Sequence, residues 1–237
     1  MIRQTFIFIL TLGSLTRIIA QENSIDTSKY QSIRNLIKDQ TFFINHGSNL
    51  EIAYRKRGVY RDEIQDYKGA IEDYTKILEF NPKDAYKIYK NIGDCLDNLK
   101  EYKAAIVNYN KAIELNPDYA NGYNNRAMCK FHLEEYKEAI QDLNKEIELN
   151  PNDFEAYYNR GKSKAELKDY EGALNDFNKA IELIPKFADV SKISDIYYNR
   201  GSCKYKLGHI DGACLDWKKA EELGDKETKE MIKRFCK

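Results

Sequence analysis

The chain has 237 residues, of which 42% are hydrophobic and 32% charged, and its formal net charge is zero. This composition is too polar for a membrane protein and, with 12% aromatic residues, too apolar for a disordered chain. The balanced charge offers no basic surface for nucleic acid, so we expect a soluble, folded protein that binds no nucleic acid.

Residues 1–20 have the pattern of a secretory signal peptide. The stretch "MIRQ" carries a positive charge, "TFIFILTLGSL" is apolar, and "TRIIA" ends on a small residue before the polar "QENS". An uncleaved membrane anchor is the alternative, but the apolar run Thr5–Leu15 has about half the length that spans a bilayer. We expect cleavage after Ala20, a secreted or periplasmic location, and no membrane span after cleavage.

Residues 21–50 precede a clear periodic pattern. Tyr30, Ile33, Leu36 and Ile37 would fall on one face of a helix that starts near residue 26 or 27. We expect this segment to cap the open end of the array that follows.

Prolines divide the rest of the chain at regular intervals. Pro82, Pro117, Pro151 and Pro185 are 35, 34 and 34 residues apart, and the first three follow Asn. Because proline cannot continue a helix, these positions mark the boundaries of a repeated structural unit.

Each repeat contains two helical patterns. The first carries a Tyr and, four residues later, a small residue: Tyr54 and Gly58, Tyr89 and Gly93, Tyr123 and Ala127, Tyr157 and Gly161, Tyr197 and Gly201. The second carries an Ala and, four residues later, a large residue: Ala70 and Tyr74, Ala105 and Tyr109, Ala139 and Leu143, Ala173 and Phe177, Ala213 and Trp217. Glycine within a helix is unfavourable, so its recurrence indicates close helix packing. We expect each small residue to face the recurring Ala, with the large side chain beside it.

This arrangement resembles the tetratricopeptide repeat. The resemblance covers residues 51–224 as five repeats, at 51–82, 86–117, 120–151, 154–185 and 194–224. It implies an all-α, right-handed solenoid of helix–turn–helix repeats. Six extra residues around 188–193 are expected to lengthen the first helix of repeat five, and residues 225–237 to form a C-terminal capping helix.

Opposite charges recur on the two helices of four repeats. Arg57, Arg126, Arg160 and Arg200 accompany Asp73, Asp142, Asp176 and Asp216, whereas repeat two has Ile92 and Asn108 at these positions. Both charges are absent from the same repeat, which favours a structural Arg–Asp pair between the helices. A solvated charge face is the alternative.

Asparagine recurs on the first helices as Asn91, Asn125, Asn159 and Asn199, whereas repeat one has Lys56 there. The resemblance implies that first helices line a concave groove, in which such a ladder hydrogen-bonds the main chain of a bound peptide. Neighbouring candidates for peptide contact are Lys90, Asn124, Tyr158 and Tyr198. The alternative is that these Asn side chains only solvate a helix surface.

No catalytic motif is present, because the chain has no HExxH, CxxC, P-loop or GxGxxG sequence. His46, His132 and His209 are scattered, and we expect them on the surface, with no metal site and no cofactor. The sequence therefore predicts a non-catalytic scaffold that binds a protein or peptide in its groove. The alternative is an accessory module of an extracytoplasmic enzyme system that captures a substrate such as a glycan.

The five cysteines include one predicted disulfide. Cys95 and Cys129 occupy the same place in neighbouring repeats, where parallel helices stand too far apart for a bridge, so we expect buried thiols. Cys214 and Cys236 are equally distant from the turn at residues 224–225 and would lie level on two antiparallel helices. We expect a bridge between them, although Cys203 could compete for Cys214.

Overall fold

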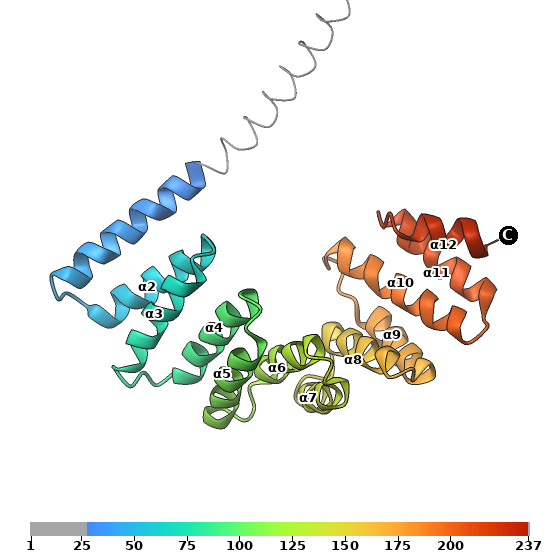
Figure 1. Cartoon of the computed structure of the whole chain (residues 1–237), viewed down its shortest axis with the longest axis horizontal. Coiled ribbons are helices and arrows are strands. Elements are labelled where there is room, and N and C mark those ends of the chain that lie inside the picture. The colour runs from blue at the N-terminus through green and yellow to red at the C-terminus, as the bar shows by residue number, and fades with distance from the viewer. Residues whose placement is uncertain (1–27, 237) are drawn as a thin grey trace, which may run out of the picture. The chain divides into compact units, whose positions relative to one another are not determined.

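The computed structural model describes residues 28–236, and every regular element in that range is an α-helix (Figure 1). This confirms the all-α prediction. The predicted signal peptide at residues 1–20 lies outside the described range. The chain divides into two compact units, one ending at Asp84 and the other beginning at Ala85.

The first unit contains a helix at residues 28–45, followed by α2 (Leu50–Glu63) and α3 (Tyr67–Leu78). The hydroxyl of Tyr30 donates a hydrogen bond to the carbonyl oxygen of Ile64 at 3.0 Å, which joins the N-terminal helix to the end of α2. Ile33 is buried, but Leu36 is exposed. The predicted apolar face is therefore only partly correct.

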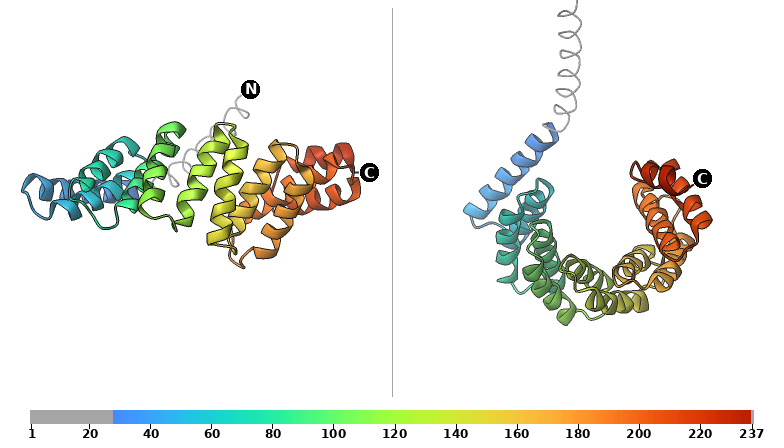
Figure 2. Two further views of the ribbon diagram at one scale, coloured as in Figure 1. Left: turned by 90° about the horizontal axis from the view of Figure 1, so that it is seen from below. Right: turned by 45° about the vertical axis from the view of Figure 1, so that its right-hand side comes forward.

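The second unit contains four helix pairs and a final short helix. The pairs are α4 (Ala85–Asn98) with α5 (Tyr102–Leu115), α6 (Ala120–His132) with α7 (Tyr136–Leu149), α8 (Phe154–Glu166) with α9 (Tyr170–Leu183), and α10 (Val190–Lys206) with α11 (Ile210–Glu222); α12 (Thr228–Phe235) follows. Each helix packs against the next one in the chain, and the first helices of successive pairs also touch (Figure 2). The surface made by α4, α6, α8 and α10 is called the first-helix face below.

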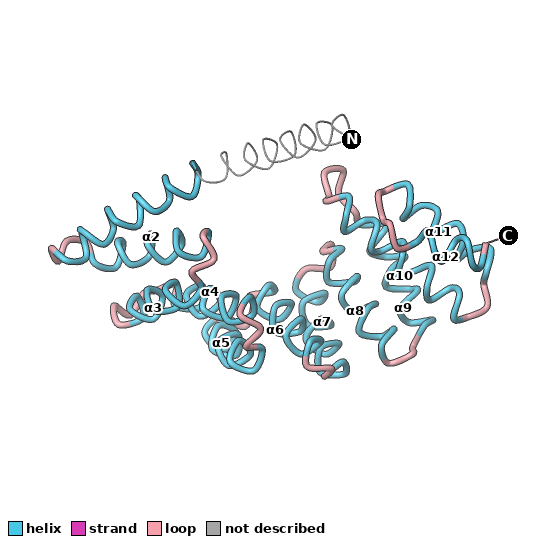
Figure 3. Tube along the Cα trace, turned by 45° about the horizontal axis from the view of Figure 1, so that its top comes forward, coloured by secondary structure: helices cyan, strands magenta, loops and turns pink. Residues whose placement is uncertain are grey.

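Helix α10 has 17 residues, whereas the other first helices of this unit have 13 or 14. The extra residues before repeat five therefore lengthen its first helix. All four prolines lie in the connections that follow the second helices. Figure 3 draws the connections between the helices as loops. The turn inside each repeat contains one residue with positive φ, which is Gln65, Lys100, Glu134, Lys168 or Gly208.

The mid-helix glycines lie against aromatic rings. A Cβ atom added to Gly93 would lie 2.6 Å from Cε1 of Tyr109, and one added to Gly161 would lie 2.7 Å from Cε1 of Phe177. Gly58 and Gly201 have the same relationship to Tyr74 and Trp217. The large side chain four residues after the recurring Ala therefore lies directly against the small residue, and at Gly201 the carbonyl oxygen of Ala213 also lies 3.2 Å from the added Cβ position.

Arg–Asp ion pairs join the two helices of repeats one, three, four and five. In each pair, Nη2 of the Arg lies 2.6 Å from Oδ1 of the Asp: Arg57–Asp73, Arg126–Asp142, Arg160–Asp176 and Arg200–Asp216. The Asp side chains are at most 7% exposed. These carboxylates are buried groups and not part of a solvated charge face.

Further partners surround each ion pair, as repeat four illustrates. Nζ of Lys164 lies 2.8 Å from Oδ2 of Asp176, so the carboxylate receives two cations. Arg160 also donates from Nη1 to Oδ1 of Asn144 in the preceding repeat at 2.8 Å, and its guanidinium lies 5.4 Å from the ring centroid of Tyr157. The motif that contains Tyr157 and Arg160 therefore fixes both the helix pair and its contact with the preceding pair.

Candidate functional site

The predicted peptide-binding residues all lie on the first-helix face. Asn91, Asn125, Asn159 and Asn199 occupy equivalent positions on α4, α6, α8 and α10. Three of them donate hydrogen bonds toward the preceding first helix. Nδ2 of Asn125 donates to Oδ1 of Asp94 at 2.9 Å, Nδ2 of Asn159 to Oδ1 of Asn124 at 3.0 Å, and Nδ2 of Asn199 to the hydroxyl of Tyr158 at 3.5 Å.

These contacts limit what the asparagines can offer to a partner. A side-chain amide has two N–H donors and one acceptor oxygen. Asn125 and Asn159 each use one donor, whereas Asn199 also donates to the carbonyl oxygen of Asp195 at 2.7 Å and so uses both. Asn159 is only 8% exposed, whereas Asn125 and Asn199 are half-buried. Asn125 therefore keeps a donor and its acceptor oxygen for a ligand, whereas Asn199 keeps only its acceptor oxygen.

An ionic cluster occupies the α4 part of this face. Lys90 forms an ion pair with Asp94 on the same helix, and the hydroxyl of Tyr109 donates to Oδ1 of Asp94 at 2.9 Å. Burial raises the pKa of Tyr109, so its hydroxyl remains a donor at neutral pH. Asp94 thus forms an ion pair with Lys90 and accepts hydrogen bonds from Tyr109 and Asn125, so it is the centre of this cluster. It was not among the predicted site residues.

An aromatic and cationic cluster lies farther along the face. Nζ of Lys162 is 4.9 Å from the ring centroid of Phe131 and 5.4 Å from that of Tyr158. No carboxylate in the described part of the chain lies within 4.0 Å of this ammonium group, and burial lowers its pKa. Lys162 was not predicted, although it stands one helical turn after Tyr158, at the position of Asp94 and Met128 in other repeats.

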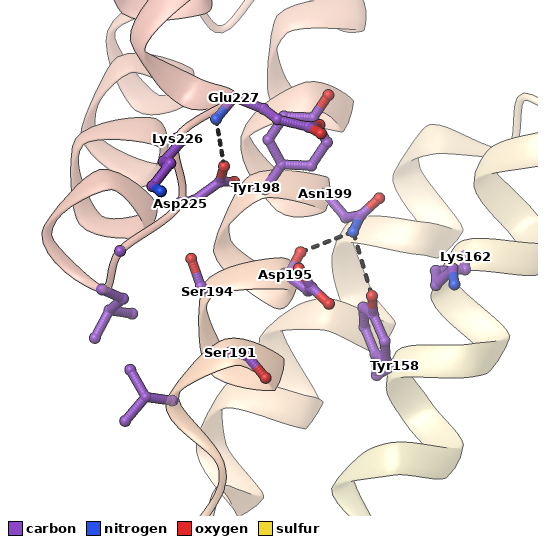
Figure 4. A pocket seen from close by; sticks show the side chains of 13 residues that line it. Tyr158, Lys162, Ser191, Ser194, Asp195, Tyr198, Asn199, Asp225, Lys226 and Glu227 are labelled. Carbon is purple, nitrogen blue, oxygen red and sulfur yellow. Dashed lines mark hydrogen bonds between the residues drawn. The ribbon is translucent and has the colours of Figure 1, made fainter. Parts of the chain in front are cut away.

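The pocket drawn in Figure 4 adjoins this cluster and has a volume of about 640 Å³. Tyr158 and Lys162 of α8 form one side, Tyr198 and Asn199 belong to α10, and the turn before α12 closes the other side. The remaining lining residues come from the first two turns of α10 and from that turn: Val190, Ser191, Ser194, Asp195, Leu223, Gly224, Asp225, Lys226 and Glu227. The predicted residues Tyr158, Tyr198 and Asn199 therefore meet at one hollow.

The cysteines are divided between one disulfide and three thiols. Cys214 of α11 is bonded to Cys236, and their Cα atoms are 5.6 Å apart. Cys95, Cys129 and Cys203 are buried and take no part in the disulfide. Burial raises the pKa of Cys203 to about 11, so this thiol is unreactive at neutral pH. The bridge ties the terminal helix α12 to α11.

His46, His132 and His209 are exposed. Within residues 28–236, no group of three or more His, Cys, Asp or Glu side chains is placed to hold a metal ion. None of the helices in this range has the length and apolar character needed to cross a membrane.

The family model of the tetratricopeptide repeat matches residues 86–119 and 154–187 of this chain. Two further models of the same repeat match residues 130–168 and 108–141. Among solved structures, MamA is 26% identical with a TM-score of 0.63, over 73% of this chain and 96% of MamA. YrrB is 24% identical with a TM-score of 0.64, over 82% of this chain and 97% of YrrB. MamA from Desulfovibrio magneticus RS-1 is 19% identical with a TM-score of 0.66, over 74% of this chain and 96% of that chain. The latter two likenesses show the fold alone. No match to a curated protein was found.

Proposed function

Since the chain is a tetratricopeptide-repeat protein, we propose that it is a non-catalytic scaffold whose first-helix face binds a protein or peptide partner. Stacked repeats form extended surfaces suited to such binding. The observation that carries the proposal is the continuous row of amide, aromatic and cationic side chains along α4, α6, α8 and α10.

Main-chain recognition by asparagine is the central element of this proposal. Asn125 has a free donor and an acceptor oxygen, and Asn199 has an acceptor oxygen, that match the carbonyl and N–H groups of an extended peptide. Aromatic rings beside polar groups, as at Tyr158 and Tyr198, are typical of peptide-binding surfaces. YrrB, which shares the fold, is described as having an unusual peptide-binding site. That site is a property of YrrB, and it supports the view that this fold can bind peptides.

Export is part of the proposal. The N-terminal twenty residues have the composition of a signal peptide, and a disulfide such as Cys214–Cys236 persists in oxidising compartments. Non-reducing peptide mapping of protein recovered from the periplasm or medium should find Cys214 linked to Cys236. A free Cys236 in that material would contradict this part of the proposal.

Binding is tested with peptides selected from a display library against the full chain. Asn125→Ala should weaken a selected peptide by about 1–3 kcal/mol because hydrogen bonds to the ligand are lost. The control Asn152→Ala changes an exposed residue in the connection between α7 and α8 and should have no effect. Circular dichroism checks that both variants remain folded.

Two outcomes would contradict the proposal. If no peptide is selected, or if Asn125→Ala and Asn199→Ala both leave the affinity unchanged, the first-helix face does not bind a peptide main chain. A glycan ligand would give a different pattern, in which Tyr198→Ala abolishes binding and Asn125→Ala does not affect it.

A further inference from the structure

We propose that the pocket between α8, α10 and the turn before α12 binds a positively charged side chain, arginine or lysine, of the partner. This inference rests on the proposed function and specifies the chemistry of the partner at one end of the first-helix face. The pocket belongs to repeat five and the terminal helix, where the chain departs most from its own repeat.

The N-terminal part of α10 builds one wall. The extra residues of repeat five lengthen α10 here, and Val190 and Ser191 of this extension line the pocket together with Ser194 and Asp195, the first residues of the repeat itself. Ser194 is 4% exposed, and its hydroxyl donates to the carbonyl oxygen of Ala220 at 3.0 Å. The start of repeat five, directly after the extension, is thereby fixed to α11.

The turn from Leu223 to Glu227 builds the opposite wall. Asp225 caps this turn by accepting a hydrogen bond at Oδ1 from the backbone N–H of Glu227 at 2.7 Å, as Figure 4 shows. The hydroxyl of Thr228, which is fully buried, donates to the carbonyl oxygen of Asp225 at 3.0 Å. The disulfide Cys214–Cys236 holds α12 against α11, so both walls are fixed before a ligand arrives.

The interior combines apolar, aromatic and polar groups. Val190 and Leu223 offer apolar surface to the methylene groups of a long side chain. The ring of Tyr198 offers an aromatic face, on which a guanidinium or ammonium group is attracted to the π electrons, whereas the ring of Tyr158 already has the ammonium group of Lys162 beside it. A volume of about 640 Å³ is large enough for one long side chain together with the adjacent peptide backbone.

Acidic groups determine the preferred charge of the ligand. Asp195, Asp225 and Glu227 line the pocket, and within residues 28–236 no Lys or Arg nitrogen lies within 4.0 Å of their carboxylate oxygens. Two lysines, Lys162 and Lys226, also line it, which leaves one net negative charge. The ammonium group of Lys162 is directed to aromatic rings and not to these carboxylates.

The raised pKa of Asp195 reflects its burial and the charges around the pocket. Burial is the main cause of its raised pKa; Lys162 opposes this shift, while Asp225, Glu227 and Asp189 contribute to it. A bound cation would offset the repulsion among these carboxylates. A bound anion would increase it.

The test uses acetyl-arginine amide as a probe and acetyl-citrulline amide as its uncharged analogue. Both are titrated into the full chain, and binding is followed by NMR at the backbone amides. The arginine probe should shift the signals of residues 190–199 and 223–228, and citrulline should shift them much less.

The double variant Asp195→Asn and Glu227→Gln should weaken binding of the arginine probe by about three- to tenfold, since two exposed charge contacts are lost. The control Glu138→Gln removes an exposed acid on α7 and should leave binding unchanged.

With these probes, three results would overturn the inference: equal binding of arginine and citrulline, no binding of either probe, or stronger binding of acetyl-glutamate amide at the same amides. The third of these results would indicate that Lys162 and Lys226 determine the charge preference. None of these results depends on Asn125, so the pocket and the proposed peptide binding can fail separately. A selected peptide that binds equally well after its basic residues are replaced by citrulline would refute the pocket and leave peptide binding intact.

Discussion

Gly161 of α8 lies directly against the ring of Phe177 of α9, so that a Cβ atom at this glycine would approach Cε1 of the ring to 2.7 Å. The ring is fully buried and cannot move aside. In repeat three the equivalent positions are occupied by a different pair, Ala127 and Leu143, both of which are fully buried. The two positions therefore change together along the chain: glycine is paired with an aromatic ring, and alanine, which is slightly larger, is paired with leucine.

Gly161→Ala is expected to destabilise the protein by about 1–2 kcal/mol, although Ala is favoured over Gly in a helix by about 1 kcal/mol. Phe177→Leu alone should also be destabilising because it leaves a cavity. The double variant reproduces the pair of repeat three, so it should be more stable than the sum of the single effects predicts. Urea unfolding followed by circular dichroism measures all three, and strict additivity would show that the two residues do not constrain each other.

Arg160→Ala is expected to lower stability by about 1–3 kcal/mol, because it removes the pair with Asp176 and the bond to Asn144. The triple variant Arg160→Ile, Lys164→Leu and Asp176→Asn reproduces the residues of repeat two and should recover much of this loss. Lys179→Ala, which breaks an exposed pair with Glu182, is the control and should change stability by less than about 0.5 kcal/mol. A triple variant less stable than Arg160→Ala would contradict a structural role for the cluster.

The residues that meet in this packing could be predicted from the sequence, because each position of one repeat can be compared with the equivalent positions of the other repeats. The absence of Arg and Asp from the same repeat indicated their pairing. The contact of Lys164 with Asp176 was not predicted, although the lysine is also absent from repeat two, where Leu96 occupies the equivalent position. The amide partner was missed because the comparison stayed within one repeat, whereas Asn144 reaches Arg160 of the next repeat.

The pocket at the end of the array could not be predicted in this way. Parts of its walls come from residues that occur once, Val190 and Ser191 of the α10 extension and the turn at Asp225, and a single occurrence offers no internal comparison. The packing of the N-terminal helix was only partly predicted for the same reason. Leu36 fits an apolar pattern and is nevertheless exposed, because a hydrophobic pattern does not show which neighbour will cover it.

The turns inside the repeats offer a test of backbone strain. Lys100, Glu134 and Lys168 adopt φ values of 60° to 63°, whereas repeat five has Gly208 at this position. A left-handed conformation is unfavourable for residues with a Cβ atom and is accessible to glycine. Each of the changes Lys100→Gly, Glu134→Gly and Lys168→Gly should therefore stabilise the protein by about 0.5–1 kcal/mol. Thermal unfolding of the combined variants should show that these increases in stability are additive. Glu138→Gly, within helix α7, is the control and should destabilise it.

A buried carboxyl group should make stability depend on pH. Glu146 of α7 is 1% exposed, and the equivalent residues of repeats four and five are Ala180 and Ala220. Its atom Oε2 has no hydrogen-bond partner in the described part of the chain. Burial, with a further contribution from Asp153, raises the pKa of Glu146 from 4.5 to about 8.

The folded protein therefore holds this proton at pH values where the unfolded chain has released it. Its contribution to stability is complete below about pH 4.5 and is lost as the pH rises to about 8. Glu146→Gln, which cannot ionise, should remove this decline and be more stable than the wild type at pH 9 by about 1–3 kcal/mol. Glu148→Gln, on the same helix and exposed, should leave the decline unchanged. Urea unfolding at intervals between pH 5 and pH 9 gives the comparison, and parallel curves for Glu146→Gln and the wild type would show that Glu146 is ionised throughout.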